Sequence, residues 1–354
     1  MPRRSHRILV TADWHIGDYR GPVVNGLNGR LIDVRNRISE LIEYAVSNSI
    51  EAIVFCGDMF RDKHPGMIHL KTAASIIKEI SSKQIKFIAI PGNHDVSKLR
   101  MHAHALSAFK PLTPNNVVIA DQPGVFELDL NTRLLLFPYM SSPQDKPLKE
   151  FLKDARKDDI LVMHGTIEGS LMTKLTDYEI HDEDTIFMDT ISKVRGVFAG
   201  HIHDNQHYGK VWYPGSLERL SFDEEYSDRG FLDITIGDTI ESKFIPVVAR
   251  RLVTIHAEDI NDVETGKLNI KDAVVRVVGA DKQNVSDIRR LLTDKGVYYI
   301  TNIQTLGVEF REAPKTGLGV PDLVKRYAQK IGYKGDMDNA TRAILEVLNS
   351  IPTA

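Results

Sequence analysis

Histidine, aspartate and asparagine residues gather in five short sequence blocks, and each block directly follows an apolar run. The blocks are Asp13-Trp-His15, Gly57-Asp58, Gly92-Asn93-His94-Asp95, His164-Gly165 and Gly200-His201-Ile-His203. Mixed carboxylate, amide and imidazole groups suit Mn²⁺, Fe²⁺ or Zn²⁺, and the absence of thiolates argues against a structural zinc site. Seven such donors exceed the needs of one ion with an open position. The blocks therefore predict two ions about 3.5–4 Å apart that share a bridging carboxylate.

The spacing within the blocks supports a metal centre. In Asp13-x-His15 and His201-x-His203, an i,i+2 spacing on extended backbone would point both side chains the same way. Each of these segments would then supply two ligands. Glycines would relieve crowding where the backbone turns sharply beside the site, and three are placed for this role: Gly57, Gly92 and Gly200.

Two ions held in this way predict the hydrolysis of phosphate esters. They would lower the pKa of a bridging water, polarise the phosphoryl oxygens and hold the ester for in-line attack. Taken singly, a DxH, GD or HxH block more often marks a turn or a hydrogen-bonded histidine than a ligand. All five blocks in this order at strand ends are improbable by chance, so we favour the metal centre. Asp95 is expected to accept hydrogen bonds rather than to bind an ion.

Short apolar runs alternate with helical patterns from residue 7 to about residue 247. The runs predict strands at 8–12, 52–56, 87–90, 134–137, 160–163 and 194–199. This order predicts an α/β layered fold, in which ligands lie beyond the carboxyl ends of the strands. We therefore expect all five blocks at one edge of one sheet. From about 209 to 247 the helical patterns vanish, and an antiparallel continuation is expected.

A smaller α+β module and a tail follow this core. Strands are expected at 252–255, 273–278, 297–303 and 306–310, with a helix at 286–292. Residues 312–319 contain one proline and two glycines, which is typical of a linker. Two short helices with apolar stripes come next, and they need a surface on which to dock. The predicted domains are 1–248 for the core, 249–312 for the capping module, 313–319 for the linker and 320–354 for the tail.

Composition excludes several classes of protein. The 354 residues carry a net charge of −3, which excludes a globally basic nucleic-acid coat but not a local DNA-binding surface. A single cysteine, Cys56, cannot form an intramolecular disulfide, so a reducing compartment is expected. No apolar run approaches the roughly 18 residues of a membrane span, and the first apolar run is too short for a signal peptide. We expect a soluble, cytoplasmic protein.

The five blocks resemble the signature of the calcineurin-like metallophosphoesterase superfamily across residues 7 to 203. Further along, the segment Val211-Trp-Tyr-Pro-Gly-Ser-Leu-Glu-Arg219 is similar to a narrower group. So are Phe222, Glu224 and Arg229-Gly-Phe231. This group is the SbcD-type (meiotic recombination eleven) double-strand-break repair nucleases, including their phage recombination relatives. The resemblance extends through the cap and the tail, and it implies a layered β-sandwich flanked by helices.

The resemblance also implies a role for each block residue. His94 would lie beside the phosphate and stabilise or protonate the leaving oxygen. The residues themselves also favour this role, because His94 is the one histidine of the five blocks that is not among the seven donors, and it is available as a general acid. The family usually prefers Mn²⁺. Its two ions would be held by Asp13, His15 and His203 on one side, by Asn93, His164 and His201 on the other, and by Asp58 between them.

One position departs from the family pattern. Many members carry Asp or His where this chain has Arg61, and use that residue to support the catalytic histidine or the substrate. Two interpretations stay open. Arg61 binds a phosphate while Asp62 or His64 takes over the support, or Arg61 is a solvated loop charge.

The function implied is that of a two-metal DNA exonuclease or endonuclease, a subunit of an SbcCD-like repair and recombination complex. The tail would dock on the coiled-coil base of an SbcC-type ABC ATPase, although it could instead pack on its own domain. A homodimer is also expected, for which a helix at 102–109 offers a surface. DNA phosphates would be bound by basic residues near the loops and in the cap: Arg3, Arg4, Lys63, Lys98, Arg100, Arg289, Arg290 and Lys295.

Three other functions agree less well with the sequence. A small-molecule or cyclic-nucleotide phosphodiesterase on the same fold is the main alternative, but it has no obvious need of the cap or the tail. A Ser/Thr phosphatase is disfavoured, because the block Gly57-Asp-Met-Phe-Arg-Asp62 lacks the GDxVDRG pattern of that group. A non-enzymatic scaffold would have lost ligands, and none is missing.

Trp14 and Tyr19 are expected to pack within the loops, with a contact to the DNA end as the other option.

Overall fold

The computed structural model describes residues 4–96, 104–112, 114–139, 143–170 and 185–305. Contacts divide the chain into one unit of residues 1–306 and a second of residues 307–354. The second unit holds the predicted linker and tail, which lie outside the described residues, as does the strand expected at 306–310. No helix in the described ranges is long and apolar enough to cross a membrane.

Two six-stranded sheets form the core. In spatial order, the first sheet contains β14 (Ile240–Val247), β13 (Arg229–Ile236), β1 (His6–Thr11), β4 (Ala52–Cys56), β5 (Lys86–Ile90) and β6 (Val117–Ile119). The strands β1, β4, β5 and β6 run parallel to one another, whereas β13 is antiparallel to both β1 and β14. The hairpin of β13 and β14 confirms part of the antiparallel continuation expected from 209 to 247.

The second sheet contains, in spatial order, β11 (Gln206–Tyr208), β12 (Val211–Tyr213), β10 (Gly196–Gly200), β9 (Ile160–His164), β8 (Thr132–Phe137) and β7 (Gly124–Asp129). Within the 209–247 segment, the expectation of antiparallel pairing is wrong for β12, which runs parallel to β10. The cause is the hairpin of β11 and β12. Because β11 returns along the sheet edge, β12 comes back in the direction of β10.

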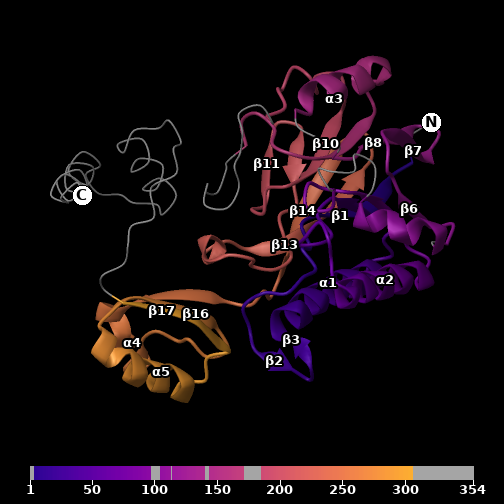
Figure 1. Ribbon diagram of the computed structural model, residues 1–354. Helices are drawn as coiled ribbons and strands as arrows, with labels where there is room; N and C mark the ends of the chain where they lie inside the picture. Colours follow the sequence, from indigo (N-terminus) through magenta and orange to yellow (C-terminus); the bar gives the residue numbers. More distant parts are fainter. Residues whose placement is uncertain (1–3, 97–103, 113, 140–142, 171–184, 306–354) are drawn as a thin grey trace, which may run out of the picture. The chain divides into compact units, whose positions relative to one another are not determined.

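Three apolar layers hold the two sheets and their helices together. Figure 1 shows how the strands and helices of this core are arranged. Side chains alternate along β1, so Leu9 packs against the helices while Ile8 and Val10 pack between the sheets. The helices α1 (Gly29–Ser47) and α2 (Met67–Ser82) cover the first sheet, and α3 (Asp145–Phe151) covers the second. This arrangement confirms the predicted α/β fold, a layered β-sandwich flanked by helices.

The five blocks lie beyond the carboxyl ends of strands in two stacked sheets, so the expectation of one sheet is wrong. The strands β1, β4 and β5 belong to the first sheet, while β9 and β10 belong to the second. All five strands have a buried, mainly apolar stretch, and only Arg7 of β1 and Lys86 of β5 are not buried. Such runs show that a strand is central, but they do not show to which sheet it belongs.

The capping module is a parallel sheet of β15 (Leu252–His256), β16 (Val274–Ala280) and β17 (Tyr299–Thr305). The helix α5 (Val285–Asp294) packs on this sheet through Ile288 and Leu292. A short helix that the sequence did not indicate, α4 (Ile260–Glu264), adds Val263 to the same core.

Shorter elements complete the description. The segment expected to be a helix at 102–109 forms a 3₁₀-helix at η1 (Ala105–Leu112), and residues 102–103 lie outside the described ranges. The remaining short elements are β2 (Val23–Val24), β3 (Leu27–Asn28), η2 (Leu152–Asp154), η4 (Phe222–Glu224), η5 (Ala257–Asp259) and η6 (Lys282–Asn284).

Candidate metal centre

The loops that follow β1 and β4 run side by side and bring the first two blocks together. The amide of Asp13 donates to the carbonyl of Gly57 at 2.9 Å, and that of His15 donates to the carbonyl of Asp58 at 3.1 Å. The carboxylates of Asp13 and Asp58 also accept hydrogen bonds from other blocks. Asp13 accepts from the amide of His201 at 3.1 Å, and Asp58 accepts from the amide of His94 at 2.8 Å. Backbone bonds thus hold the blocks in one cluster.

The i,i+2 pairs do not lie on extended backbone, which corrects the reasoning from their spacing. Asp13 has a φ of 53°, His15 of 45° and His201 of 96°, and Asp58 has a φ of 60°. Left-handed conformations are costly for residues with a Cβ and persist where surrounding contacts enforce them, often at functional sites. The side chains therefore converge through tight turns beyond the strand ends.

Asp13, His15 and His203 form one group of side chains that could hold an ion. The Nε2 atoms of His15 and His203 lie 3.2 Å apart, and Asp13 Oδ1 lies 3.9 Å from His15 Nε2. Asp13 and His15 are buried, whereas His203 is partly exposed. The first half of the centre therefore opens toward solvent on the side of His203.

Asn93, His164 and His201 form the second group. Asn93 Oδ1 lies 2.8 Å from His164 Nε2 and 3.1 Å from His201 Nδ1. Asp58 stands between the two halves, because its Oδ2 is 3.4 Å from His164 Nε2 and 3.6 Å from His15 Nε2. The structure thus brings together all seven predicted ligands. Side chains close enough to share an ion also cross the two halves, such as Asp13, Asp58 and His164. The assignment of the ligands to two ions stays a prediction.

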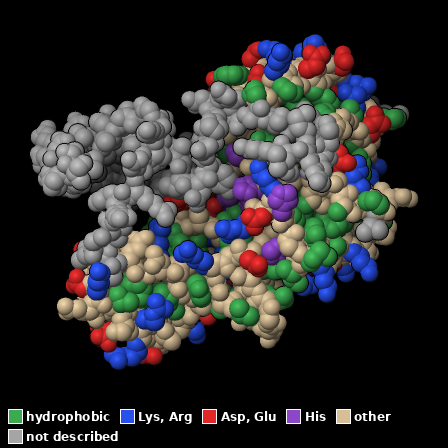
Figure 2. Space-filling view, viewed as in Figure 1, with side chains coloured by type: hydrophobic (Ala, Val, Ile, Leu, Met, Phe, Trp, Pro, Cys, Tyr) green, Lys and Arg blue, Asp and Glu red, His purple; other side chains and the backbone are tan. Residues whose placement is uncertain are grey.

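Histidine side chains gather in one area of the molecular face in Figure 2, with acidic and basic side chains beside them. The predicted ligands are unequally exposed. The base of the centre is buried, because four of the ligands are at most 2% exposed: Asp13, His15, Asp58 and His164. The open side of the centre, from which a substrate can approach, is marked by three partly exposed ligands and by the neighbouring His94. The three ligands are Asn93, His201 and His203.

Close packing explains all three predicted glycines. Gly57 has a φ of 97°, and a Cβ on it would come within 2.5 Å of His164 Nδ1 and 2.9 Å of the Gly92 Cα. A Cβ on Gly92 would come within 2.5 Å of the Asp58 amide nitrogen and overlap its carboxylate. A Cβ on Gly200 would overlap the carbonyl of Cys56 and come within 2.8 Å of His164 Nδ1. These glycines let the strand ends approach closely enough for the ligands to meet, as their positions in the blocks predicted.

The polar atoms of the second half fit a cation. The carbonyl of Cys56 lies 2.8 Å from His164 Nδ1 and can only accept, so this nitrogen carries the proton. A neutral ring, the form that binds a metal ion, would direct its Nε2 lone pair at the oxygens of Asn93 and Asp58. Three electron-rich atoms facing one another are stable only around a positive charge, which a divalent ion supplies in such donor sets.

The pKa values of the buried ligands also show that their carboxylates favour a positive charge nearby. Burial disfavours the charged ring of His164, but the neighbouring Asp58 carboxylate outweighs this and raises its pKa to about 9. Burial also opposes ionisation of Asp58, yet His164 and His15 lower its pKa below the usual range. Burial raises the pKa of Asp13 to about 6, although His203 and His164 oppose the shift.

His94 lies beside the centre, near His15, with 4.9 Å between the ring centroids. Its Nδ1 is 2.7 Å from the main-chain carbonyl of Arg61. The structure places the Arg61 carbonyl at His94 Nδ1, where the sequence suggested Asp62 or His64 as the support. The Arg61 guanidinium lies over the Tyr19 ring at 4.2 Å, and the residue is exposed, so phosphate binding and a solvated loop charge both stay predictions.

Asp95 accepts hydrogen bonds, as expected. Its carboxylate lies 2.9 Å from the Gly92 amide, 3.0 Å from that of Phe60 and 3.2 Å from that of Met59. Burial raises the pKa of Asp95 to about 7, and the Asp58 charge adds to the shift. The side chain therefore fastens the loop after β5 to the loop after β4.

Several predicted DNA contacts are placed differently. Trp14 is 1% exposed and packs on Phe55, so it belongs to the core and cannot touch a DNA end. Arg4 precedes β1 and pairs with Glu51 at 3.7 Å, at the end of the sheet opposite to the centre. Arg290 pairs with Asp287 in the cap at 3.0 Å. Three of the predicted cations lie outside the described residues: Arg3, Lys98 and Arg100.

Two residues behind the centre were missed as site residues. Glu224 Oε1 lies 2.7 Å from His203 Nδ1, and Gln144 Nε2 donates to the carbonyl of His164 at 3.1 Å. Glu224 did belong to the motif of the narrower nuclease group, although that motif gave it no role. No feature of the sequence pointed to Gln144.

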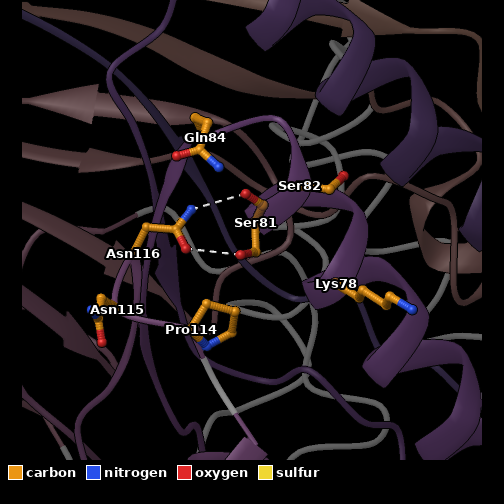
Figure 3. A pocket seen from close by; sticks show the side chains of 7 residues that line it. All are labelled: Lys78, Ser81, Ser82, Gln84, Pro114, Asn115 and Asn116. Atoms are coloured by element: carbon orange, nitrogen blue, oxygen red, sulfur yellow. Dashed lines mark hydrogen bonds between the residues drawn. The ribbon is translucent and has the colours of Figure 1, made fainter.

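A separate pocket of about 500 Å³ lies at the end of α2 (Figure 3). Ser81 Oγ donates to Asn116 Oδ1 at 2.8 Å, and Asn116 Nδ2 donates to the Ser81 carbonyl at 3.1 Å. Lys78 is the one charged residue in its lining, which contains no carboxylate or histidine. The bonds across this pocket fasten α2 to the segment before β6, and the pocket lacks groups for phosphoryl chemistry.

Comparisons with known proteins agree with this geometry. The family model for calcineurin-like phosphoesterases matches residues 6–205, which include all five blocks. Exonuclease subunit 1 of Enterobacteria phage T4 is 27% identical over 243 residues, which cover 68% of this chain and 67% of that protein. The expected resemblance to the superfamily is confirmed, and the phage relative fits the narrower nuclease group.

Solved structures of similar proteins include a dimetal phosphatase from Danio rerio, which is 12% identical with a TM-score of 0.45 and covers 68% of this chain and 99% of its own. A calcineurin-like phosphoesterase from Bacillus subtilis is 12% identical with a TM-score of 0.41 and covers 69% of this chain and 91% of its own. The family model matches more than half of the residues, and on that match the chain belongs to the calcineurin-like phosphoesterases.

Proposed function

We propose that this metal-dependent phosphoesterase is a DNA nuclease that cleaves phosphodiester bonds at DNA ends. One observation carries the proposal: the candidate ligands meet in two halves that share Asp58, with His94 beside them on the open side. The similarity to a phage protein named as an exonuclease subunit supports DNA as the substrate. The proposed cofactor is a pair of Mn²⁺ ions, although the donor set also suits Fe²⁺ and Zn²⁺.

The chain's own groups would act on the phosphate from fixed positions. Two bound ions would lower the pKa of a water and neutralise charge on the phosphoryl oxygens. His94 would stabilise or protonate the leaving oxygen, because its ring lies beside the centre and its Nδ1 is held by the Arg61 carbonyl. Buried carboxylates and imidazoles would need little rearrangement to hold the ions.

Arg61 is proposed to bind a phosphate of the DNA backbone. Its carbonyl faces His94, and its guanidinium lies over Tyr19, whose hydroxyl donates to the His15 carbonyl at 2.8 Å. The positive charge is therefore fixed next to the proposed acid and next to a ligand segment. A planar guanidinium forms paired hydrogen bonds to phosphate, which an isolated lysine charge cannot do.

We further propose that the protein works as a subunit in DNA repair and recombination. The T4 relative is itself named as a subunit. In this proposal residues 320–354 bind an SbcC-type ABC ATPase, and the nuclease forms a homodimer. Deletion of residues 320–354 should abolish co-purification of the ATPase and leave phosphodiesterase activity intact. Retention of the ATPase at full affinity would contradict this assignment of the tail.

The substrate is tested by Mn²⁺-dependent digestion of linear duplex, hairpin and single-stranded DNA beside cyclic nucleotides. Cleavage of DNA by the native protein is expected, and Asp58→Ala and His94→Ala should abolish or strongly reduce it. His207→Ala is a matched control, because this exposed histidine stacks on Trp212 away from the ligands. Hydrolysis of cyclic nucleotides without cleavage of any DNA form would overturn the nuclease proposal in favour of the small-molecule phosphodiesterase.

A further inference from the structure

A carboxylate stands directly behind one histidine of the centre. Glu224, in the short helix η4, is 7% exposed and places Oε1 at 2.7 Å from His203 Nδ1. Its other oxygen, Oε2, accepts from the amide of Leu220 at 2.8 Å. Both carboxylate oxygens therefore have defined partners, and the side chain has one orientation.

This contact fixes which nitrogen of His203 faces the centre. A carboxylate only accepts hydrogen bonds, so His203 Nδ1 carries a proton and Nε2 is the nitrogen that faces the centre. His203 Nε2 lies 3.2 Å from Nε2 of His15, a predicted ligand of the same half. A carboxylate bonded to the far nitrogen makes a ligating imidazole a stronger electron donor.

Arg229 holds the backbone on which this ring is mounted. Its side chain is fully buried and donates to the carbonyl of His203, to Ser216 Oγ at 2.9 Å and to Asp204 Oδ1 at 2.8 Å. It also lies 3.8 Å from Glu224 Oε2. Residues between β12 and the start of β13 therefore hold both the ring and the main chain of His203 in place.

The two halves of the centre differ in this respect. Behind His164, the partner of Nδ1 is the neutral carbonyl of Cys56 at 2.8 Å. Behind His203, it is a carboxylate. A charged partner raises the basicity of a ligating imidazole more than a neutral one does, and loss of such a partner commonly weakens metal binding about 10–100-fold.

We propose that Glu224 is a positioning residue that sets the affinity of one ion site, the one formed by Asp13, His15 and His203, and leaves the other unchanged. The inference rests on the proposed two-ion centre. Glutamine at this position cannot replace the carboxylate. Its amide has one acceptor and one donor group, whereas the His203 N–H and the Leu220 amide both require acceptors.

The test is a calorimetric titration of the metal-free full-length protein with Mn²⁺, checked by electron paramagnetic resonance of free Mn²⁺. The native protein should bind two ions. Glu224→Gln should weaken one step about 10–100-fold and leave the second step within about twofold. Glu225→Gln is the matched control, because the same change lies one residue away and its amide can keep both bonds to Thr254.

The outcomes separate the positioning role from the metal centre itself. If the native protein binds no Mn²⁺, the proposed centre fails. If the native protein binds two ions and Glu224→Gln binds both with unchanged affinity, or weakens both steps equally, the positioning role fails while the centre stands. Thermal melting in EDTA checks folding. Should Glu224→Gln not fold, Glu224→Asp retains the charge one methylene further away, and a smaller loss confined to the same step is expected.

Discussion

The Nδ1 atom of His94 lies 2.7 Å from the main-chain carbonyl oxygen of Arg61. Because a carbonyl oxygen only accepts, His94 Nδ1 carries a proton and donates it to this bond. A backbone atom thus fixes the orientation of the proposed acid at the position where the family pattern has an Asp or His side chain. The side chain of Arg61 is thereby released for a different role.

This relationship predicts that Arg61→Ala separates binding from chemistry. The carbonyl remains, so His94 keeps its orientation and kcat should stay within about threefold. Loss of a hydrogen bond to a charged phosphate should raise KM for DNA about tenfold, the lower end for such bonds. In contrast, His94→Ala should lower kcat about 10²–10⁴-fold. Steady-state kinetics on a short duplex give both constants.

The control for Arg61→Ala is Arg35→Ala, which removes an exposed cation of α1 that is not among the predicted DNA contacts. It should leave both constants unchanged. A fall in kcat of Arg61→Ala comparable to that of His94→Ala would show that the Arg61 side chain takes part in the chemistry, contrary to this assignment.

A second prediction concerns Gly92. A methyl group at this position would come within 2.5 Å of the Asp58 amide nitrogen and overlap the Asp58 carboxylate. Gly92→Ala should therefore displace Asp58 and abolish Mn²⁺-dependent cleavage, and the overlap with a main-chain atom should also lower thermal stability. Gly237→Ala is the control, because its nearest neighbour would be Ser5 Oγ at 3.9 Å. Retained activity in Gly92→Ala would mean that Asp58 does not need its observed position.

A third prediction joins the capping module to the centre. Glu225, next to Glu224, accepts from Thr254 of β15 at 3.0 and 2.7 Å, and Arg276 of β16 lies over the Phe222 ring at 4.6 Å. The segment that positions His203 is therefore anchored on the cap. Arg276→Ala should weaken one Mn²⁺ site by about 0.5–2 kcal/mol, although the residue touches no ligand.

Mn²⁺ titration of Arg276→Ala and of the double variant with Glu224→Gln checks this connection. If the cap acts through Glu224, the two losses should be less than additive. Fully additive losses would mean that the cap and Glu224 act independently.

Much of this organisation could be predicted from the sequence, because it depends on side-chain types at strand ends. The strand expected at 52–56 is found at those bounds, and Gly92 and Gly200 have the close contacts that their positions indicated. The division into two sheets could not be predicted, since central strands of either sheet are apolar on both faces. Nor could the left-handed turns at Asp13 and His15, which arise only once the adjacent loop is in place.

The partners behind the ligands were harder to predict for a different reason. The carbonyls of Cys56 and Arg61 are main-chain atoms, and every residue has one, so no residue type marks them. Glu224 does have a recognisable side chain, but it lies 21 positions from His203 in the sequence. Only the return of the chain along β11 and β12 brings the two together.

The last prediction concerns stability away from the centre. Asp159, 2% exposed at the start of β9, lies 2.6 Å from Arg133 Nη2 and 2.8 Å from its Nε. Burial disfavours the carboxylate, but the Arg133 bonds and the Arg156 amide outweigh it and lower its pKa below 3.8. A lowered pKa means that the unfolded state binds the proton more tightly. The pair therefore stabilises the fold above about pH 4, and this contribution is lost as the pH falls through the folded-state pKa.

Asp159→Asn should thus lower the free energy of unfolding by about 2–3 kcal/mol at pH 7, because it leaves a largely buried guanidinium without its charged partner. The difference from the native protein should shrink as the pH falls below about 4, as the native carboxyl becomes protonated. Urea unfolding of both proteins in EDTA at several pH values measures it. A difference that does not change with pH would show that packing, and not the charge of Asp159, is what the substitution removes.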